Sequence, residues 1–338
     1  MAATLRDVAA LAGVSFRTVS NVINGYQYIS DSTRAKVEAA IAQLGYQPNY
    51  SARSLRLGRS NLLGLAVPTL SQGYYAELAS EIIDLARKRG FIVLTEQTNS
   101  NRELELDALR GARRQMTDGL LINPLALSSD DAALFTTERP VVLLGENTFS
   151  TTVDHVTMKN TDAAASAVTF LIELGHRRIA LIGIADAGAT AVGTANLRTA
   201  GYHRALAEHG IERDATLELS VGFWRQEDGA AAVRQLLERG VEFDAVFALT
   251  DILAIGAMHE LQAAGVSIPD DVSVIGFDDL VESRYTVPEL TTVDGGRRQI
   301  AEAAVRTLIN RIEKPQSPVV FHEVDFTIVQ RGSTRRRP

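Results

Sequence analysis

Two short amphipathic stretches open the chain, with a glycine between them. In residues 4–12 the apolar positions fall on one helical stripe, and Thr4 with Asp7 can form a reciprocal cap at its start. Gly13 permits a sharp turn, and Ser15 can cap a second short helix that has its own apolar face. Two short helices joined by a glycine-bearing turn predict a helix-turn-helix, whose second helix fits the major groove of DNA.

The residues that follow bear on whether this is a DNA-binding unit or an ordinary helical hairpin with a solvated polar face. A third amphipathic helix is expected over residues 31–44, with Val37, Ala40, Ile41 and Leu44 facing inward. The segment LGYQPNYSARSLRLGRS comes next. Because the three helices and this segment occur together, we interpret the N-terminal block as a DNA-binding unit.

From residue 62 onward, short apolar runs alternate with amphipathic helices. Nearly continuous apolar strands joined by helices predict parallel sheets buried on both faces, and the run is long enough for two such subdomains. The strands are expected at 62–67, 91–96, 119–123, 140–145, 178–183, 245–249 and 272–277, and the helices near 75–89, 102–115, 161–174, 195–209, 226–239, 252–264 and 296–313.

The length of 338 residues predicts two or three domains, and the charge is divided unevenly between them. Residues 1–60 hold seven Lys and Arg against three Asp and Glu, which gives +4. The remainder holds 27 against 38, which gives −11 and accounts for the net charge of −7. A basic N-terminal segment on an acidic remainder is typical of a DNA-binding module attached to a domain with a different function.

Composition also limits the compartment and the chemistry. The chain has no cysteine, which excludes disulfides, thiolate catalysis and cysteine-based metal sites and fits a reducing cytoplasm. Its first residues lack an apolar run of signal-peptide length, and no stretch approaches the length of a membrane span. We therefore expect a cytoplasmic protein that reaches the nucleoid and has no membrane partner.

Motifs for catalysis are missing from the α/β region. The patterns G-x-G-x-x-G, G-x-x-x-x-G-K, G-x-S-x-G and H-E-x-x-H do not occur. The six histidines are scattered, and the pairs Asp130–Asp131 and Asp278–Asp279 come with no partner base or nucleophile. We expect no enzyme activity, no catalytic residue, no cofactor and no metal site.

The block TLRDVAALAGVSFRTVSNVINGYQYISDSTRAKVEAAIAQLGYQPNYSARSLR resembles the headpiece of the lactose-repressor family of bacterial transcription regulators. The resemblance continues more weakly in LGHRRIALIG, LRTAGYHRAL, DILAIGA and DVSVIGFDD. It implies an α/β fold class: an all-α helix-turn-helix headpiece, then two doubly wound parallel-sheet subdomains of the periplasmic-binding-protein type, joined by three crossing strands.

The resemblance also implies domain boundaries. We expect a headpiece at 1–48, a hinge helix and linker at 49–60, and an effector-binding domain at 61–331, whose first subdomain is about 61–160 plus 295–321 and whose second is about 161–293 plus 322–331. The basic tail at 332–338 is expected to be disordered. Because no leucine heptads follow the last strand, a homodimer is expected in place of a tetramer.

Contacts with base edges are expected from the start of the second helix. The guanidinium of Arg17 can make a bidentate contact with guanine, and Asn21 lies one turn further on the same face. Phe16 can contact a thymine methyl group. The family carries specificity at these three positions, although Phe16 could instead pack on the headpiece core. The other expected DNA-binding residues of the headpiece, which suit phosphate contacts or capping, are Thr4, Ser15, Thr18, Ser20 and Asn24.

Residues 49–57, NYSARSLRL, are too few to hold a helix alone. The resemblance implies a hinge helix that orders on operator DNA beside its twin in the dimer. Leu55 stands where the family has a leucine that wedges into the minor groove, and Arg53 and Arg56 suit the negative potential of that groove. Tyr50 belongs to the same expected set. The alternative is that Leu55 docks on the core domain.

The cleft between the two subdomains is the expected site for a small-molecule effector. Gly145 and Glu146 depart from the family's pattern of an aspartate followed by an aromatic residue, so the identity of the effector does not carry over. A sugar is expected, with a nucleobase or another metabolite as the alternative. The residues that match effector-contacting positions of the family, each of which could also be structural, are Tyr74, Tyr75, Asn123, Arg198, Trp224, Asp251 and Asp278.

The sequence therefore predicts a ligand-responsive, sequence-specific DNA-binding regulator, in the first place a repressor, that binds a pseudo-palindromic operator as a homodimer. Whether the effector releases DNA or promotes binding stays open, as do the operator sequence and the choice between repressor and activator. A solute-binding receptor is a remote alternative, because it would need a signal peptide and would lack the headpiece.

Overall fold

The computed structural model forms two compact units, residues 1–60 and residues 61–338. The structure describes residues 3–23, 26–46, 59–127, 129–135, 138–146, 152–185 and 193–337. The predictions for Asn24, Tyr50, Arg53, Leu55 and Arg56 lie outside these residues.

The N-terminal unit contains the three predicted helices: α1 (Leu5–Ala12), α2 (Phe16–Ile23) and α3 (Asp31–Leu44). Each helix contributes one fully buried valine to the core of the unit, namely Val8, Val19 and Val37. The prediction of a helix-turn-helix followed by a third helix is confirmed.

The turn between α1 and α2 follows from local chemistry. Thr4 and Asp7 form the predicted reciprocal cap, in which the backbone N–H of Thr4 donates to Asp7 Oδ2 at 2.8 Å. Gly13 ends α1 with a φ of +66°, a left-handed conformation that a side chain would strain.

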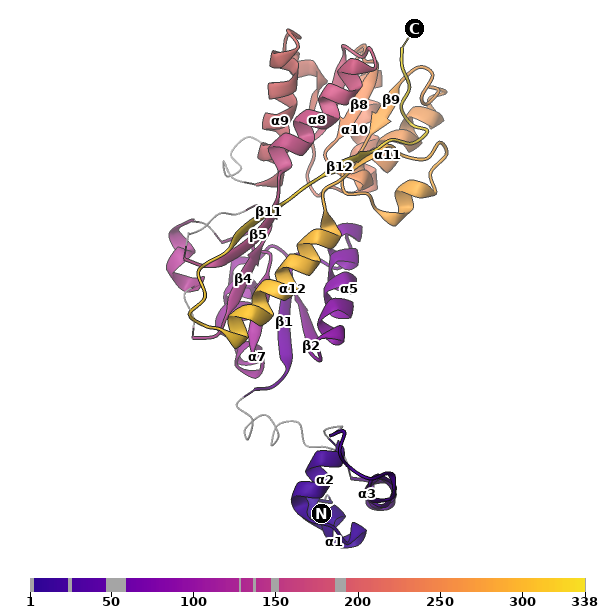
Figure 1. Cartoon of the computed structure of the whole chain (residues 1–338). Helices are drawn as coiled ribbons and strands as arrows, with labels where there is room; N and C mark the ends of the chain where they lie inside the picture. Colours follow the sequence, from indigo (N-terminus) through magenta and orange to yellow (C-terminus); the bar gives the residue numbers. More distant parts are fainter. Residues whose placement is uncertain are drawn as a thin grey trace. The chain divides into compact units, whose positions relative to one another are not determined.

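The first subdomain of the larger unit is built on a six-stranded parallel sheet with the order β11-β5-β4-β3-β1-β2. Helices α5 and α12 lie side by side against it (Figure 1). The strands are β1 Leu62–Val67, β2 Ile92–Gln97, β3 Gly119–Ile122, β4 Val141–Leu144, β5 Asp154–Met158 and β11 Phe321–Val324. The helices are α5 Gly73–Lys88, α6 Arg102–Arg110, α7 Ala112–Met116, the 3-10 helix Ser129–Phe135, and α12 Arg297–Glu313.

The second subdomain has a four-stranded parallel sheet with the order β7-β6-β8-β9. Helix α8 packs on α9, and α10 packs on α11. The strands are β6 Ile179–Ile184, β7 Glu218–Ser220, β8 Ala245–Ala248 and β9 Ser273–Ile275. The helices are α8 Asn160–Glu173, α9 Thr194–Glu208, α10 Gln226–Glu238, α11 Asp251–Ala263 and the 3-10 helices Ala215–Leu217 and Val281–Arg284. The two parallel-sheet subdomains confirm the predicted fold class.

The chain passes between the two sheets three times: after β5, between β10 and α12, and between β11 and β12 (Figure 1). Strands β10 (Thr292–Asp294) and β12 (Thr327–Val329) pair antiparallel at the crossing. Because β11 pairs with β5, residues 322–324 belong to the first subdomain, so the expected boundary near residue 322 moves to the end of β11. No helix in the described part of the chain is long and apolar enough to cross a membrane.

The C-terminal tail corrects a prediction. The sequence predicts a disordered tail at 332–338, yet in its described part Ser333 is fully buried and the backbone carbonyl of Ser333 accepts a hydrogen bond from Val274 N at 2.8 Å. Arg335 pairs with Asp270, and Arg337 pairs with Asp244 at 2.8 Å. The tail is therefore held by backbone pairing with β9 and by acidic side chains of the second subdomain.

Candidate DNA-contact face and ligand site

Helix α2 presents a polar face that begins at its cap. Ser15 Oγ accepts a hydrogen bond from Thr18 N at 3.0 Å, so Ser15 caps the helix as predicted. Phe16 and Arg17 are exposed on the first turn, and Asn21 is half-buried one turn later. Phe16 is not part of the apolar core of the unit, which argues against its alternative role as a packing residue.

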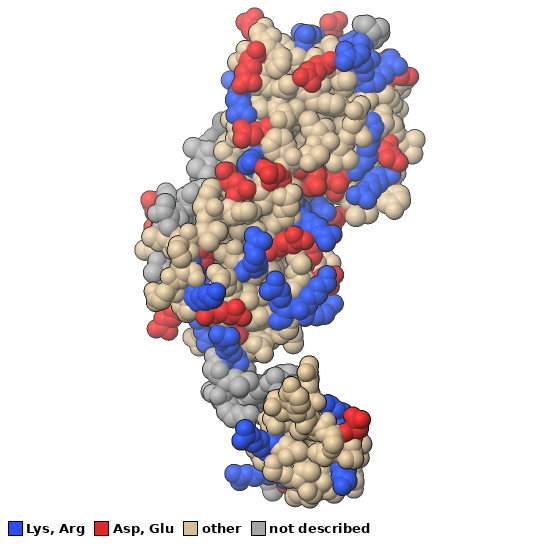
Figure 2. Space-filling view, in the orientation of Figure 1, with Lys and Arg blue, Asp and Glu red and all other residues tan. Residues whose placement is uncertain are grey.

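The other expected DNA-binding residues of this unit differ in how accessible their hydroxyl groups are to a DNA phosphate. Thr4 is exposed, but its hydroxyl donates to Asp7 Oδ2 at 2.7 Å within the cap. Ser20 is buried, so its hydroxyl is less available to a phosphate than those of Ser15 and Thr18. Figure 2 shows Lys and Arg outnumbering Asp and Glu on the visible face of the unit, which suits a polyanionic partner.

The larger unit has a cleft between its two subdomains, at the ends of strands β3, β4, β5, β8 and β9. The cleft holds about 560 Å³ of empty space, part of it open to solvent. Six of the seven predicted effector residues line it: Tyr74, Tyr75, Asn123, Arg198, Trp224 and Asp278. The other lining residues are Gln72, Gly73, Glu146, Met158, Thr194, Thr250, Ile252 and Leu280.

Arg198 is a buried cation at the floor of the cleft. Its Nε donates to Asn160 Oδ1 at 2.8 Å, and its Nη1 donates to the carbonyl of Leu249. Its Nη2 lies 3.4 Å from Asp278 Oδ1, and its guanidinium carbon stacks 3.5 Å from the ring centre of Phe277. The side chain is thus fixed in one orientation before any ligand arrives.

Asp278 is held in an uncommon backbone conformation with a φ of +114°. Its N–H donates to Val293 O at 2.8 Å, and its carbonyl accepts from Arg297 Nη1 at 3.0 Å. Burial raises the pKa of Asp278 to about 6, against the opposing effect of Arg198 and Arg297. A backbone that is strained and held from several sides is characteristic of a functional position.

Glu146 follows β4 and joins the two subdomains across the cleft. Its Oε1 accepts from Asn160 Nδ2 and its Oε2 from Thr194 Oγ1, both at 2.8 Å. Asn160 also bonds Arg198, so a continuous polar chain runs from Glu146 through Asn160 and Arg198 to Asp278. The sequence marked Glu146 only as a departure from the family pattern, and the structure places it in the cleft.

Aromatic side chains form the walls. Tyr74 and Tyr75 meet edge to face, with ring centres 5.3 Å apart. Burial, followed by the Glu146 and Asp278 carboxylates, raises the pKa of both phenols. Trp224 is half-buried and packs against two apolar clusters, one of which lies wholly in the second subdomain. These rings offer flat apolar surface next to charged groups.

Asn123 is buried, and its Oδ1 has no hydrogen-bond partner among the residues that the structure describes. A Cβ atom on Gly145 would come within 2.9 Å of the Asn123 amide, and Gly145 has a φ of +87°. Glycine at position 145 therefore leaves room for the amide to reach the cleft. A buried oxygen without a partner at the edge of a cleft is a place for a ligand group or a water molecule.

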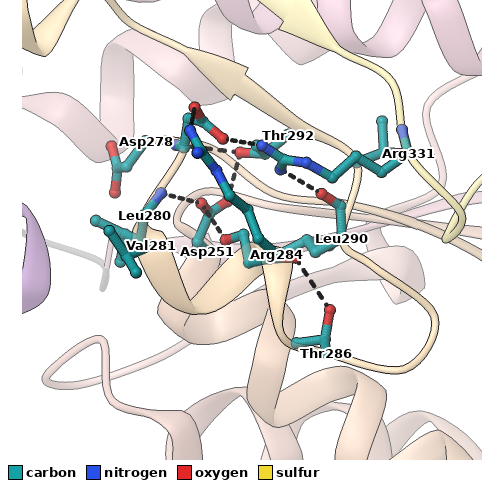
Figure 3. Close-up of polar contacts among 12 residues, drawn as sticks. Asp251, Asp278, Leu280, Val281, Arg284, Thr286, Leu290, Thr292 and Arg331 are labelled. Carbon is teal, nitrogen blue, oxygen red and sulfur yellow. Dashed lines mark hydrogen bonds and ion pairs between the residues drawn. The ribbon is translucent and has the colours of Figure 1, made fainter.

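Asp251 corrects the seventh prediction. It is fully buried and does not line the cleft; instead its carboxylate accepts from Leu280 N at 2.8 Å and from the hydroxyls of Ser283 and Thr292 (Figure 3). Burial, with a contribution from Asp278, raises the pKa of Asp251 to about 8. Thr250, the N-cap of α11, lines the cleft in its place.

The residues missed by sequence reasoning share one signal. Glu146, Thr194, Thr250 and Leu280 all stand within a few residues of the end of a strand or the start of a helix, where the predicted effector residues also stand. These four residues could therefore have been identified from the sequence by their positions at strand ends and helix starts. No group of three or more His, Cys, Asp or Glu suited to a metal ion occurs within the described residues.

Comparison with known proteins extends these observations over the whole chain. Residues 4–49 match the family model of bacterial regulatory proteins of the lacI family, and residues 168–334 match that of a periplasmic binding protein-like domain. The chain is 37% identical to the HTH-type transcriptional regulator AscG of Escherichia coli (strain K12), over 86% of each chain. It is 31% identical to the HTH-type transcriptional repressor PurR of Histophilus somni (strain 129Pt), over 98% of this chain and 99% of that one.

Solved structures are similar over the same length. The lac repressor dimer bound to operator and the anti-inducer ONPF matches with a TM-score of 0.84 and 30% identity, covering 99% of this chain and all of that one. The complex of the transcriptional regulator CelR with cellobiose matches with a TM-score of 0.71 and 31% identity, covering 98% and 99%. The relatives named here are regulators of transcription, not enzymes.

Proposed function

The chain belongs to the lacI family of bacterial regulatory proteins, and on that premise we propose that it is a transcriptional repressor whose affinity for its operator is controlled by a sugar.

The observation that carries the sugar proposal is the presence of aromatic faces and carboxylates in one cleft. Tyr74, Tyr75 and Trp224 provide surface for the C–H face of a sugar ring, and Glu146 and Asp278 provide acceptors for its hydroxyl groups. The complex of the related CelR with cellobiose supports this choice of ligand class.

The proposed reading of DNA uses the exposed start of α2. Arg17 and Asn21 contact base edges in the major groove, and Phe16 contacts a thymine methyl group or a sugar. The remaining headpiece contacts go to phosphates and set the register. The related lac repressor is a dimer on its operator, which supports a homodimer on a pseudo-palindromic site here.

The proposed link between the two sites is the segment 49–57, which contains Tyr50, Arg53, Leu55 and Arg56 and lies outside the described residues. On operator DNA, Leu55 would enter the minor groove between two base steps and bend the duplex. Closure of the cleft would move the first subdomains of the dimer relative to each other, and so change the free energy of ordering the two hinge segments on DNA.

The test uses the only tryptophan of the chain as a reporter. Trp224 lines the cleft, so a bound sugar should change its fluorescence. The full chain is titrated with a panel of monosaccharides and disaccharides, and each positive compound is then added to the protein bound to an operator obtained by binding-site selection. The proposal requires a sugar that changes both the fluorescence and the affinity for operator. A nucleobase that does so while sugars do not would overturn it.

A further inference from the structure

The loop from Asp278 to Val281, which follows β9, is held by both subdomains. It carries two residues of the cleft lining, Asp278 and Leu280. Within the second subdomain, Asp251 accepts a hydrogen bond from Leu280 N at 2.8 Å (Figure 3). From the first subdomain, Oε1 of Glu77 on α5 accepts one from Val281 N at 3.1 Å. A wall of the cleft in the second subdomain is therefore bonded directly to a helix of the first.

Arg297, the first residue of α12, joins the same loop to the same helix. Its Nη1 donates to the backbone carbonyl of Asp278 at 3.0 Å, and its Nη2 lies 2.5 Å from Glu77 Oε2. One oxygen of Glu77 thus contacts Arg297 and the other contacts Val281 N. The side chains of Arg297 and Glu77 are only 14% and 22% exposed, so water screens this ion pair less than a pair at the surface.

The Glu77–Arg297 pair lies outside the lining of the cleft, whereas Asp278 and Leu280 belong to it. Asp278 has a φ of +114°, a conformation that persists only where the surroundings hold it. Arg297 supplies one of the contacts that hold it, at the carbonyl of Asp278. The pair can therefore influence a ligand through the loop, without contacting the ligand itself.

A second carboxylate gives Arg297 an alternative partner. Its Nε lies 3.5 Å from Oε1 of Glu81, one helical turn beyond Glu77 on α5. The other oxygen of Glu81 is buried and has no hydrogen-bond partner in the part of the chain that the structure describes. A movement of the loop that loosens Arg297 from Glu77 can thus be answered by closer pairing with Glu81. Two discrete arrangements of one contact are what the transmission of a conformational change requires.

The order of elements along the chain gives this contact its consequence. The DNA-binding unit ends at residue 60, and α5 is the first helix after that boundary among the described residues. Glu77 therefore belongs to the part of the larger unit that follows the DNA-binding unit most closely in sequence. The loop that it holds belongs to the second subdomain.

Resting on the proposed function, we infer that Glu77 and Arg297 are positioning residues that couple the ligand cleft to operator binding. They hold the loop from Asp278 to Val281 in the position that receives the ligand, and they pass its movement on ligand binding to α5. Binding at the cleft changes the affinity for DNA only as far as such contacts distinguish the two states of the protein.

The experiment measures ligand affinity and coupling separately on the full chain. Glucose, ribose, cellobiose and hypoxanthine are titrated with Trp224 fluorescence as the signal, and the affinity for a selected operator is measured with and without each compound at saturation. Glu77→Gln removes the charge but keeps the size of the side chain, and Glu81 still compensates Arg297. We expect this variant to bind the active compound within about tenfold of wild type, while the effect of the compound on operator affinity falls at least about threefold.

The possible results separate the inference from the proposed function. An undiminished effect of the compound in folded Glu77→Gln overturns the inference and leaves a sugar-controlled repressor standing. A loss of ligand affinity well beyond tenfold, with the effect at saturation unchanged, also overturns it, because the pair would then serve binding alone. If only hypoxanthine acts, the sugar proposal fails and the pair is tested with that compound. If no compound changes the operator affinity of the wild type, both fail.

A double-mutant cycle shows whether the two residues act as a pair. Arg297→Gln should reduce the effect of the ligand as Glu77→Gln does, and the double variant should lose no more than the larger of the two single losses. Losses that add would overturn the pairing. Arg298→Gln and Glu302→Gln break an exposed ion pair of the same helix and should leave the effect unchanged. Thermal midpoints show which variants are folded, and Glu77→Gln decides alone where Arg297→Gln is not.

Discussion

Asp251 Oδ2 accepts a hydrogen bond of 2.8 Å from the backbone N–H of Leu280, 29 residues later in the chain. The same carboxylate also accepts from the hydroxyls of Ser283 and Thr292 (Figure 3). Leu280 lines the ligand cleft and Asp251 does not. Asp251 therefore affects the cleft indirectly, because it fixes the loop that carries the lining residues Asp278 and Leu280.

Replacement of Asp251 should destabilise the α/β unit. Asp251→Ala leaves three buried donors unpaired, so we expect a loss of about 2–4 kcal/mol in the free energy of unfolding. Urea denaturation of the full chain measures it. Asp84→Ala, which removes a solvent-exposed carboxylate from α5, is the control and should stay within about 0.5 kcal/mol. Similar midpoints for the two variants would contradict the structural role of Asp251.

The raised pKa of Asp278 predicts opposite effects of pH on stability and on ligand binding. The pKa of Asp278 is about 6 in the folded chain, against 3.8 for an ordinary aspartate, so folding favours the protonated form. Its contribution to stability is fully present below pH 4 and is lost as the pH rises through about 6, by up to about 3 kcal/mol. Affinity for a hydroxylated ligand should rise over the same interval, because the carboxylate becomes an acceptor.

The variant Asp278→Asn isolates this effect from other titrating groups. The difference in unfolding free energy between wild type and variant should depend on pH between 4 and 7, and the variant should lose the pH dependence of ligand affinity. Unfolding curves and sugar titrations at several pH values in this interval measure both. A difference that is constant with pH would show that Asp278 does not titrate there.

Most of the predicted strands are those whose own residues are apolar. Strands β1, β3, β4, β6 and β8 are continuous apolar runs, and each was found within one or two residues of its predicted position. Strand β5, with the sequence DHVTM, is just as buried but was not predicted. Its Asp154 is neutralised by Arg311 at 2.8 Å, and its His155 bonds Gly145 O at 2.6 Å. Those partners lie elsewhere in the sequence, so no local pattern reveals them.

The ligand site was predictable to the level of strand ends but not of single residues. Thr250 and Asp251 are neighbours after β8, and which of them faces the cleft depends on the loop around Leu280, far away in the chain. The position of Glu146 in the cleft could not be predicted from its neighbours in sequence, because its hydrogen-bond partners Asn160 and Thr194 lie across the cleft. Tertiary contacts, in both cases, decide what the local pattern leaves open.

The face of α2 predicts how base preference is set. Arg17→Ala and Asn21→Ala should each weaken operator binding by about 1–3 kcal/mol and relax the preference at individual base pairs. Lys36→Ala, which removes an exposed charge of α3 outside this face, is the control and should leave the preferred sequence unchanged. Binding-site selection on all three variants measures this. An unchanged preferred sequence for both Arg17→Ala and Asn21→Ala would refute the assignment of this face.

The proposed homodimer predicts the behaviour of the chain in solution. Sedimentation equilibrium at micromolar concentration should therefore give twice the mass of 36.6 kDa. A stable tetramer or a monomer under these conditions would contradict the proposal.

The contacts of the C-terminal tail predict that this segment stabilises the second subdomain, although it has no regular secondary structure of its own. Strand β9 is at the edge of its sheet, and Ser333 covers that edge: Val274 N donates to Ser333 O at 2.8 Å, and Ser333 Oγ donates to Val274 O at 2.6 Å. Ser333 Oγ also accepts from Thr291 N at 2.7 Å. Exposed strand edges pair with other chains, so removal of this cover should both destabilise the subdomain and promote aggregation.

A stop codon at Gly332 removes all of these contacts, and Ser333→Ala removes only the hydroxyl. We expect a loss of about 1–3 kcal/mol for Ser333→Ala and a larger loss, with faster amide exchange in β9, for the truncation. Arg336→Ala, at an exposed position of the same tail, is the matched control and should leave the unfolding midpoint unchanged. A truncated chain with the midpoint and β9 protection of the wild type would refute the role of the tail, because backbone pairing that carries free energy cannot be removed without a change in either quantity.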